Sequence, residues 1–309
     1  MKIAVIGSGA MGCLYGAYLS LNNDIIMIDS NKEVVDEIKK NGILLEEMNR
    51  QKKQYTSHID AYYSGQYHKK VDLVIMFVKS IYLDNALEQN KNMFFENTLV
   101  LTLQNGAGND NKISKYVKEE NIIIGTTKHN AVTFGLGRSK HTGPGVTIIG
   151  SKSHSVDILL TIEETLKNSK FETVISGDIQ RIIWEKLFVN LSINTFTAIT
   201  QTKIGYMIEN KDAWRFAKRL IYEAVEVAEE DGTYFDRREV LENVKKVCHS
   251  ISNGYSSMYQ DVKRKMRTEI DAINGVIIEQ AKLYGVPVPY NSLIVDLIHA
   301  IEGAYDYEK

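Results

Sequence analysis

Residues 1–16 read MKIAVIGSGAMGCLYG, and this stretch decides the fold of the chain. Residues 2–6 are a short apolar run with β-branched side chains, which is typical of a buried strand. The residues that follow at once form a GxGxxG pattern, namely Gly7, Ser8, Gly9, Ala10, Met11 and Gly12. An apolar helical pattern comes next. A strand, a glycine turn and a helix in this order predict that the six residues bind the pyrophosphate of a dinucleotide.

Each glycine of this pattern has its own physical reason. Gly7 permits the tight turn, and Gly12 lets the helix lie close to the strand. Gly9 has no side chain, so the backbone can approach the pyrophosphate. The free N–H groups and the positive end of the helix dipole then face the phosphates.

Asp29 ends the second predicted strand, residues 25–28, and stands 22 residues after Gly7. A carboxylate at this distance is expected to accept hydrogen bonds from the ribose hydroxyls and to repel a 2′-phosphate. No arginine follows that could receive such a phosphate, although Lys32 is near. Asp29 therefore favours NAD over NADP. The alternative is that Asp29 only caps the next helix, predicted over residues 33–40.

Further apolar runs predict more strands, at residues 73–78, 98–103, 122–124 and 146–149, with short extra strands between 43 and 67. The segment HTGPG at residues 141–145 predicts a turn. Lys79 and Asn105 each follow one of the apolar runs, and ligands of an open α/β sheet bind beyond the carboxyl ends of its strands. The alternatives are a surface lysine and a turn asparagine.

Strand–helix alternation fades after about residue 175, and the chain then has helical patterns to its end. We therefore expect an α/β fold with a doubly wound dinucleotide-binding domain over residues 1–176 and an all-helical domain over residues 177–309. The predicted helix 178–200 is apolar nearly all round, yet Lys186, Asn190 and Asn194 form one stripe at i, i+4 and i+8. Buried polar groups need partners or a ligand. The alternatives are a structural hydrogen-bond stripe or a lysine that reaches the rim.

Residues 253–275 carry polar side chains whose local interpretation is structural. Ser257 precedes a basic loop at residues 263–267, which is typical of a solvated turn. Thr268 begins a predicted helix, and Glu269 in its first turn is favoured by the helix dipole. This helix is expected to end at Gly285.

Composition excludes several classes of protein. The 309 residues carry a net charge of −2, so no broad basic field attracts nucleic acid or an anionic membrane. No apolar run is long enough to span a bilayer, and no signal peptide is expected. Cys13 and Cys248 have no metal-ligand spacing and form no disulfide framework, so we expect no metal and a reduced, cytoplasmic setting.

A set of motifs in order along nearly the whole chain resembles the ketopantoate reductases (2-dehydropantoate 2-reductases). These motifs are GSGAMG, VKS, LQNG, GTT-x-H, H-x-G-x-G-x-T-x-I-G, W-x-K-L-x-x-N-x-x-I-N and SSMYQD…TEIDAING. The resemblance implies a Rossmann-type domain joined to a helical domain, with the active site in the cleft. It also implies hydride transfer from NADPH to a 2-keto acid, and specifically reduction of ketopantoate to D-pantoate in pantothenate biosynthesis.

The resemblance assigns roles residue by residue. Lys186 and Glu269 match the family's catalytic lysine and glutamate, and Ser257 its substrate-binding serine. Asn190 and Asn194 match asparagines one and two turns after the lysine, which are expected to bind substrate. Lys79, Asn105 and Glu269 are expected to line the cofactor, and Asn105 also the substrate.

Asp29 departs from the family pattern, because members that use NADPH commonly carry a basic residue after the second strand. The cofactor is therefore NAD(P)H, with NADH favoured by Asp29 and NADPH kept as an alternative. A branch of the same family resembles NAD-dependent D-2-hydroxyacid dehydrogenases that act on bulky 2-keto acids, and this is the alternative function. A non-catalytic NAD(H)-sensing regulator is an alternative of another class. Besides a small 2-keto acid, a second copy of the chain in a homodimer is the one partner left open.

Overall fold

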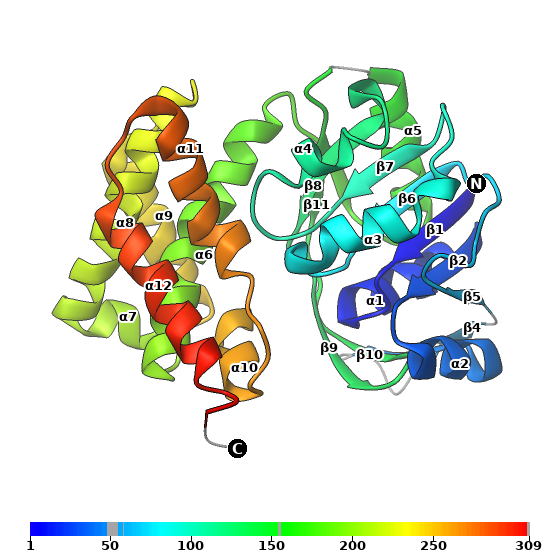
Figure 1. The fold of residues 1–309 in the computed structure, drawn as a ribbon, viewed down its shortest axis with the longest axis horizontal. Coiled ribbons are helices and arrows are strands. Elements are labelled where there is room, and N and C mark those ends of the chain that lie inside the picture. Colours follow the sequence, from blue (N-terminus) through cyan, green and yellow to red (C-terminus); the bar gives the residue numbers. More distant parts are fainter. Residues whose placement is uncertain (48–54, 58, 154–155, 308–309) are drawn as a thin grey trace. The chain divides into compact units, whose positions relative to one another are not determined.

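The computed structural model describes residues 1–47, 55–57, 59–153 and 156–307 (Figure 1). The chain forms two compact units. The first unit comprises Met1–Gln104 and Gly108–Ile179, and the second unit comprises Asn105–Ala107 and Gln180–Lys309. Along the chain, the boundary between the two units falls between Ile179 and Gln180, close to the boundary expected at residue 177. The short excursion Asn105–Ala107 into the second unit has no counterpart in the sequence prediction.

An eight-stranded sheet forms the centre of the first unit, as the doubly wound prediction requires. Its order is β12-β11-β8-β7-β6-β1-β2-β5, and every neighbouring pair is parallel except β8 with β11. The strands are β1 (Lys2–Ile6), β2 (Asp24–Asp29), β5 (Asp60–Tyr63), β6 (Leu73–Met76), β7 (Leu99–Thr102), β8 (Ile122–Thr127), β11 (Thr147–Gly150) and β12 (Thr173–Ile175). The central strand β6 is a continuous apolar run because it is buried on both faces.

Helices cover this sheet and connect its strands. They are α1 (Ala10–Leu19), α2 (Lys32–Asn41), α3 (Leu83–Gln89), α4 (Asn109–Ile113) and α5 (Val156–Asn168). Asn31 is the N-cap of α2, since its side chain accepts hydrogen bonds from the backbone N–H groups of Glu33 and Val34. The interpretation of Asp29 as the cap of this helix is therefore wrong.

A second sheet explains why α1 has no polar face. Its order is β4-β3-β10-β9, with β3 (Ile43–Glu47), β4 (Tyr55–Ser57), β9 (Asn130–Gly135) and β10 (Arg138–Gly143). Helix α1 contacts β1 and β2 of the large sheet and also β3, β9 and β10 of the second sheet, so its residues from Gly12 onward are buried. The short extra strands expected between residues 43 and 67 are confirmed.

The turn predicted for residues 141–145 is wrong at its start. His141 and Gly143 belong to β10, which pairs with β9 in a hairpin and with β3 in parallel. The turn of this hairpin lies earlier, at Gly137, whose φ is +62°. Neither strand shows the alternation of a half-buried strand, because five of the six residues of β9 are exposed and β10 reads RSKHTG, without an apolar side chain.

The second unit is all-helical, as expected (Figure 1). Its elements are α6 (Ile179–Thr200), α7 (Tyr206–Glu209), α8 (Lys211–Glu230), α9 (Arg237–Ser250), α10 (Ser257–Lys263), a π-helix (Asp271–Gly275), α11 (Val276–Tyr284) and α12 (Pro289–Gly303). Trp184, Phe188 and Leu191 of α6 lie in its core. Gly285 ends α11 with a φ of +73°, and Pro289 is the first residue of α12.

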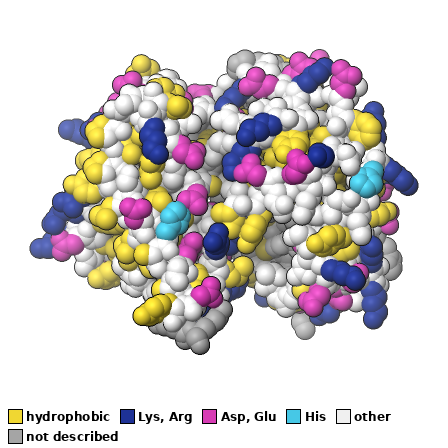
Figure 2. Space-filling model, viewed as in Figure 1, with side chains coloured by type: hydrophobic (Ala, Val, Ile, Leu, Met, Phe, Trp, Pro, Cys, Tyr) yellow, Lys and Arg dark blue, Asp and Glu magenta, His cyan; other side chains and the backbone are white. Residues whose placement is uncertain are grey.

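Charges of both signs are interspersed over the face that Figure 2 draws, without a continuous basic field on it. Among the described helices, none has the length and hydropathy needed to cross a lipid bilayer.

Candidate active site

The glycine loop has the geometry that the GxGxxG pattern predicts. Gly7 has a φ of +101°, and a Cβ there would lie 2.6 Å from the backbone nitrogen of Val78. A Cβ at Gly12 would overlap the carbonyl oxygen of Gly7. A Cβ at Gly9, in contrast, would meet nothing within 4 Å. Gly7 and Gly12 are therefore needed to close the turn, while Gly9 keeps space open at the start of α1.

Two features of the loop fit a phosphate group. Gly9 is the N-cap of α1, and no side chain caps the helix there. The hydroxyl of Ser8 is buried and has no hydrogen-bond partner. N–H groups at a helix start and a buried hydroxyl without a partner are groups that a pyrophosphate would satisfy. The residues present therefore fit a dinucleotide, whose pyrophosphate Gly7 to Gly12 would bind.

Asp29 fixes the glycine loop through the backbone. Its Oδ2 accepts a hydrogen bond from the N–H of Ser8 at 2.6 Å, and its Oδ1 accepts one from the N–H of Asn31 at 2.8 Å. Each carboxylate oxygen has a further lone pair, so both can still accept from ribose hydroxyls. The structure thus ties Asp29 to the glycine loop, a role that the sequence did not indicate.

Lys79 follows β6 on the segment that borders the glycine loop, since Val78 is the close neighbour of Gly7. Gln104 ties the ends of two strands together there. Its Nε2 donates to the carbonyl of Val78 at 2.7 Å, and its Oε1 accepts from the hydroxyl of Thr102 at 3.0 Å. Lys79 thus lies at the carboxyl edge of the sheet.

Lys186, Asn190 and Asn194 lie along α6 as the spacing predicts. Asn194 is buried, with 8% of its surface exposed, and the other two are half-buried. Burial lowers the pKa of Lys186 to about 8, while the nearby carboxylate of Glu269 acts in the opposite direction. A lysine with this pKa exchanges a proton readily near neutral pH, as an acid catalyst must.

Glu269 and Asn105 come together in the second unit. The side-chain amide of Asn105 donates to Glu269 Oε2 at 3.2 Å. Gly106 follows with a φ of +87°, and a Cβ there would overlap the carbonyl of Ala272 in the π-helix. The same carbonyl accepts a hydrogen bond from the N–H of Ala107 at 3.2 Å. These contacts of the LQNG motif place Asn105 beside Glu269, whose carboxylate raises the pKa of Lys186.

Ser257 is exposed, and its neighbour fixes its position. Ser256 caps α10 by accepting a hydrogen bond from the N–H of Tyr259 at 3.0 Å, and its hydroxyl also pairs with that of Thr197 on α6 at 2.7 Å. Thr197 lies one turn after Asn194 on α6. The chain therefore presents Ser257 next to the helix that carries the polar stripe.

Sequence reasoning assigned no role to two histidines that the structure pairs. His129 Nδ1 lies 3.1 Å from His141 Nε2, in the first unit. His129 is buried edge-on against the stacked rings of Tyr15 and Phe171, and its Nε2 has no partner. Burial, together with His141, lowers the pKa of His129 to about 4. The two histidines lie in the GTT-x-H and H-x-G motifs, but neither motif indicates that they meet.

No group of three or more metal-ligating side chains occurs among the residues with described positions. Lys186 and Glu269 can exchange protons, and the amide and hydroxyl groups near them can hydrogen-bond a polar substrate.

Comparison with known proteins places both units in one family. Residues 3–154 match the family model of ketopantoate reductase PanE/ApbA, and residues 178–302 match the model of its C-terminal part. A 2-dehydropantoate 2-reductase of Pyrococcus horikoshii is 33% identical over 98% of both chains. One of Streptococcus pyogenes is 29% identical over the full length of both.

Solved structures agree with this assignment. D-mandelate dehydrogenase, in a ternary structure with NADH and anilino(oxo)acetate, is 30% identical and superposes with a TM-score of 0.92 over 99% of both chains. A dimeric ketopantoate reductase from Staphylococcus aureus, at 20% identity and a TM-score of 0.80, covers 99% of this chain and 100% of its own, and shows the same fold. The family models, the relatives and the site geometry agree, and the chain belongs to the ketopantoate reductase family.

Proposed function

We propose that the protein is a nicotinamide-dependent 2-keto acid reductase whose substrate is ketopantoate, which it reduces to D-pantoate. The observation that carries this proposal is that the half-buried Lys186 lies near Glu269 and has a pKa lowered to about 8. The same chain has a complete glycine loop. The family models and the curated relatives support the choice of ketopantoate.

The residues of the second unit suit the chemistry of a keto group. A bound nicotinamide cofactor supplies the hydride. Lys186 in its charged form stabilises the negative charge that develops on the keto oxygen, and then donates a proton to it. Glu269 keeps Lys186 charged and can accept a hydrogen bond from a substrate hydroxyl. Ser257, Asn190 and Asn194 can donate to the substrate carboxylate.

We propose that the first unit binds the cofactor through Gly7 to Gly12, with Lys79 near it, and that NADH is preferred. Asp29 supports this preference, because a carboxylate accepts from both ribose hydroxyls and repels a 2′-phosphate. The related D-mandelate dehydrogenase was solved with NADH, which also supports it.

One alternative has an observation of its own. D-mandelate dehydrogenase resembles this chain with the TM-score of 0.92, and its bound anilino(oxo)acetate carries an aromatic group on an oxo acid. Together with Asp29, this favours an NAD-dependent D-2-hydroxyacid dehydrogenase that acts on bulky 2-keto acids. The same Lys186 and Glu269 would serve that reaction.

The test is a matrix of steady-state rates on the purified protein. Ketopantoate, phenylglyoxylate and a branched-chain 2-keto acid are each measured with NADH and with NADPH. The highest kcat/KM for ketopantoate with NADH supports the main proposal. A higher value for phenylglyoxylate would favour the dehydrogenase, and a preference for NADPH would refute the role given to Asp29. Binding of NADH without turnover of any keto acid would instead indicate a sensor.

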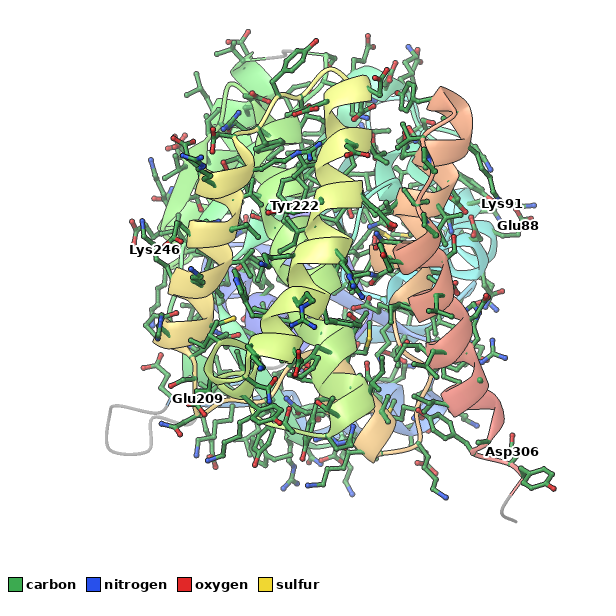
Figure 3. All side chains as sticks on the ribbon, turned by 90° about the vertical axis from the view of Figure 1, so that its left-hand side faces the viewer. Glu88, Lys91, Glu209, Tyr222, Lys246 and Asp306 are labelled. Atoms are coloured by element: carbon green, nitrogen blue, oxygen red, sulfur yellow. The ribbon has the colours of Figure 1, made fainter. Side chains whose placement is uncertain are left out.

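We further propose that the enzyme is a homodimer in the cytoplasm. Tyr290, Leu293 and Leu297 form an exposed apolar stripe on α12, and Tyr222 of α8 lies exposed on the same unit (Figure 3). Exposed apolar patches often mark interfaces. Leu293→Glu should convert a dimer to a monomer in analytical ultracentrifugation, whereas Leu160→Glu, at another exposed leucine on α5 of the first unit, should not. A wild-type monomer would contradict the proposal.

A further inference from the structure

Side chains of helix α12 form hydrogen bonds with both ends of the segment that carries Glu269. The segment comprises residues 268–274, and its second half is the π-helix without its last residue. Helix α12 packs against this π-helix. Two different side chains of α12 form these hydrogen bonds, one near the end of the helix and one near its start.

Glu302, near the end of α12, holds the residue before Glu269. Its Oε1 accepts a hydrogen bond from the N–H of Thr268 at 2.8 Å and another from the Thr268 hydroxyl at 2.7 Å. The Thr268 oxygen in turn accepts from the N–H of Ile270 at 3.2 Å. Thr268 is 2% exposed. Hydrogen bonds to a charged carboxylate are stronger than neutral ones, so this end of the segment is firmly held.

Asn291, near the start of α12, holds the other end. Asn274 Nδ2 donates to Asn291 Oδ1 at 3.0 Å and to the carbonyl of Leu191 on α6 at 3.2 Å. Asn291 is itself fixed, because its Nδ2 and its backbone N–H donate to Glu223 Oε2 at 2.7 and 2.9 Å. Both asparagines are fully buried. These hydrogen bonds join the π-helix, α6, α8 and α12 away from water, where each bond is electrostatically stronger than in water.

The bond from Asn274 to the carbonyl of Leu191 joins the π-helix to α6. Leu191 stands five residues after Lys186, and Asn274 stands five residues after Glu269. The segment with Glu269 is thus tied to α6, which carries Lys186, as well as to α12.

We propose that Glu302 and Asn274 are positioning residues that hold Glu269 beside Lys186 through Thr268 and the π-helix. This inference rests on the proposed reduction of a 2-keto acid, and it assigns a role to α12, which offers no catalytic side chain of its own. A small displacement of a positioned group lowers catalytic rates steeply. Loss of these hydrogen bonds should therefore lower kcat more than it weakens the binding of substrate and NADH.

The test compares Glu302→Ala with the conservative variant Glu302→Gln. The glutamine keeps an oxygen that can accept both hydrogen bonds from Thr268, and the alanine keeps none. Thr268→Val removes only the hydroxyl and serves as the second variant if Glu302→Ala does not fold. Three quantities are measured: kcat and KM for the keto acid, the affinity for NADH, and the pKa of Lys186. The last comes from NMR of ¹³C-dimethylated lysines, assigned with Lys186→Arg.

We expect kcat of Glu302→Ala to fall about tenfold or more, with NADH affinity within about twofold of the wild type. The pKa of Lys186 should fall further below its wild-type value, because Glu269 no longer supports the charged form. In a Glu269→Ala background, Glu302→Ala should have no further effect on that pKa. Glu302→Gln should restore most of kcat.

Wild-type kcat and an unchanged pKa of Lys186 in Glu302→Ala would overturn the inference, even if the variant were less stable. Failure of the wild type on every 2-keto acid would overturn the proposed function instead. The NMR comparison decides the positioning role in that case too, because it requires no turnover.

Discussion

At the scale of one residue, Lys186 is a position where burial of a charge lowers the free energy of unfolding. It occupies a half-buried position on α6 among apolar neighbours, where a charged ammonium group loses hydration. The unfolded chain restores that hydration, so the lysine destabilises the native state below its unfolded pKa. A residue that costs stability and lies beside a carboxylate is typical of an active site.

Lys186→Met should therefore stabilise the protein while it abolishes turnover. The pKa of Lys186 is lowered from 10.5 to about 8, so between these values the unfolded state binds more protons and stability rises with pH. Below pH 8 the full penalty applies, which amounts to about 3 kcal/mol. Urea denaturation at pH 7 should show a higher midpoint for Lys186→Met than for the wild type. A lower midpoint would indicate that the charge is well accommodated.

The same pKa predicts the pH dependence of the reaction. Lys186 must be protonated to donate its proton, so kcat/KM for keto acid reduction should fall as pH rises through about 8. Glu269→Gln should move this fall to lower pH, because the carboxylate favours the charged lysine. The measurement is a pH–rate profile from pH 6 to 10 with both enzymes. A profile without a decline at alkaline pH would exclude Lys186 as the acid.

At the scale of elements, regular periodicity was predictable and pairing was not. The sequence predicted β1, the glycine loop, α6 and the stripe of Lys186, because apolar period and glycine spacing are local signals. The hairpin of β9 and β10 was missed, since β9 is mostly exposed and β10 has no apolar side chain. Its hydrogen bonds to β3 are contacts between distant residues.

The candidate site divides in the same way. Residue types and spacing indicated Lys186 and the glycines, but not the bond between Asn105 and Glu269 or the joining of Asn105–Ala107 to the second unit. Nor did the sequence show that the π-helix meets Gly106. These features depend on how the chain packs, and no local pattern encodes them.

The glycine loop offers a pair of matched variants. Gly12→Ala should destabilise the first unit by about 2 kcal/mol or more, because its Cβ would overlap the Gly7 carbonyl oxygen. Gly9→Ala should leave stability nearly unchanged, since its Cβ meets nothing within 4 Å, yet weaken NADH binding by occupying space at the start of α1. Thermal melts and fluorescence titration with NADH separate the two effects. Equal affinity for NADH in Gly9→Ala and the wild type would contradict the assigned pyrophosphate site.

The histidine pair predicts an acid sensitivity of the first unit. His129 is neutral in the fold down to pH about 4, whereas an unfolded histidine titrates near 6.5. The unfolded state therefore binds more protons between these values, and stability should fall as pH drops from 6.5 to 4, by at most about 3 kcal/mol. His129→Gln should show a shallower fall in denaturation experiments across this range. An unchanged slope would mean that other groups cause it.

At the scale of the whole molecule, the proposed roles fall on different units of the chain. The first unit offers the glycine loop and Asp29, which fit a dinucleotide, and the second offers Lys186, Glu269 and the asparagines of α6. The fold is that of the family over its full length. One fold can serve different reactions, so the substrate has to be established from the side chains of the site rather than from the fold.

The most direct test of this account is the rate of 2-keto acid reduction by Lys186→Ala, measured together with its affinity for NADH. We predict that kcat falls by a factor of about 10² to 10⁴, while the dissociation constant for NADH stays within about twofold of the wild-type value. A variant that keeps the wild-type kcat would contradict the assignment of Lys186 as the proton donor.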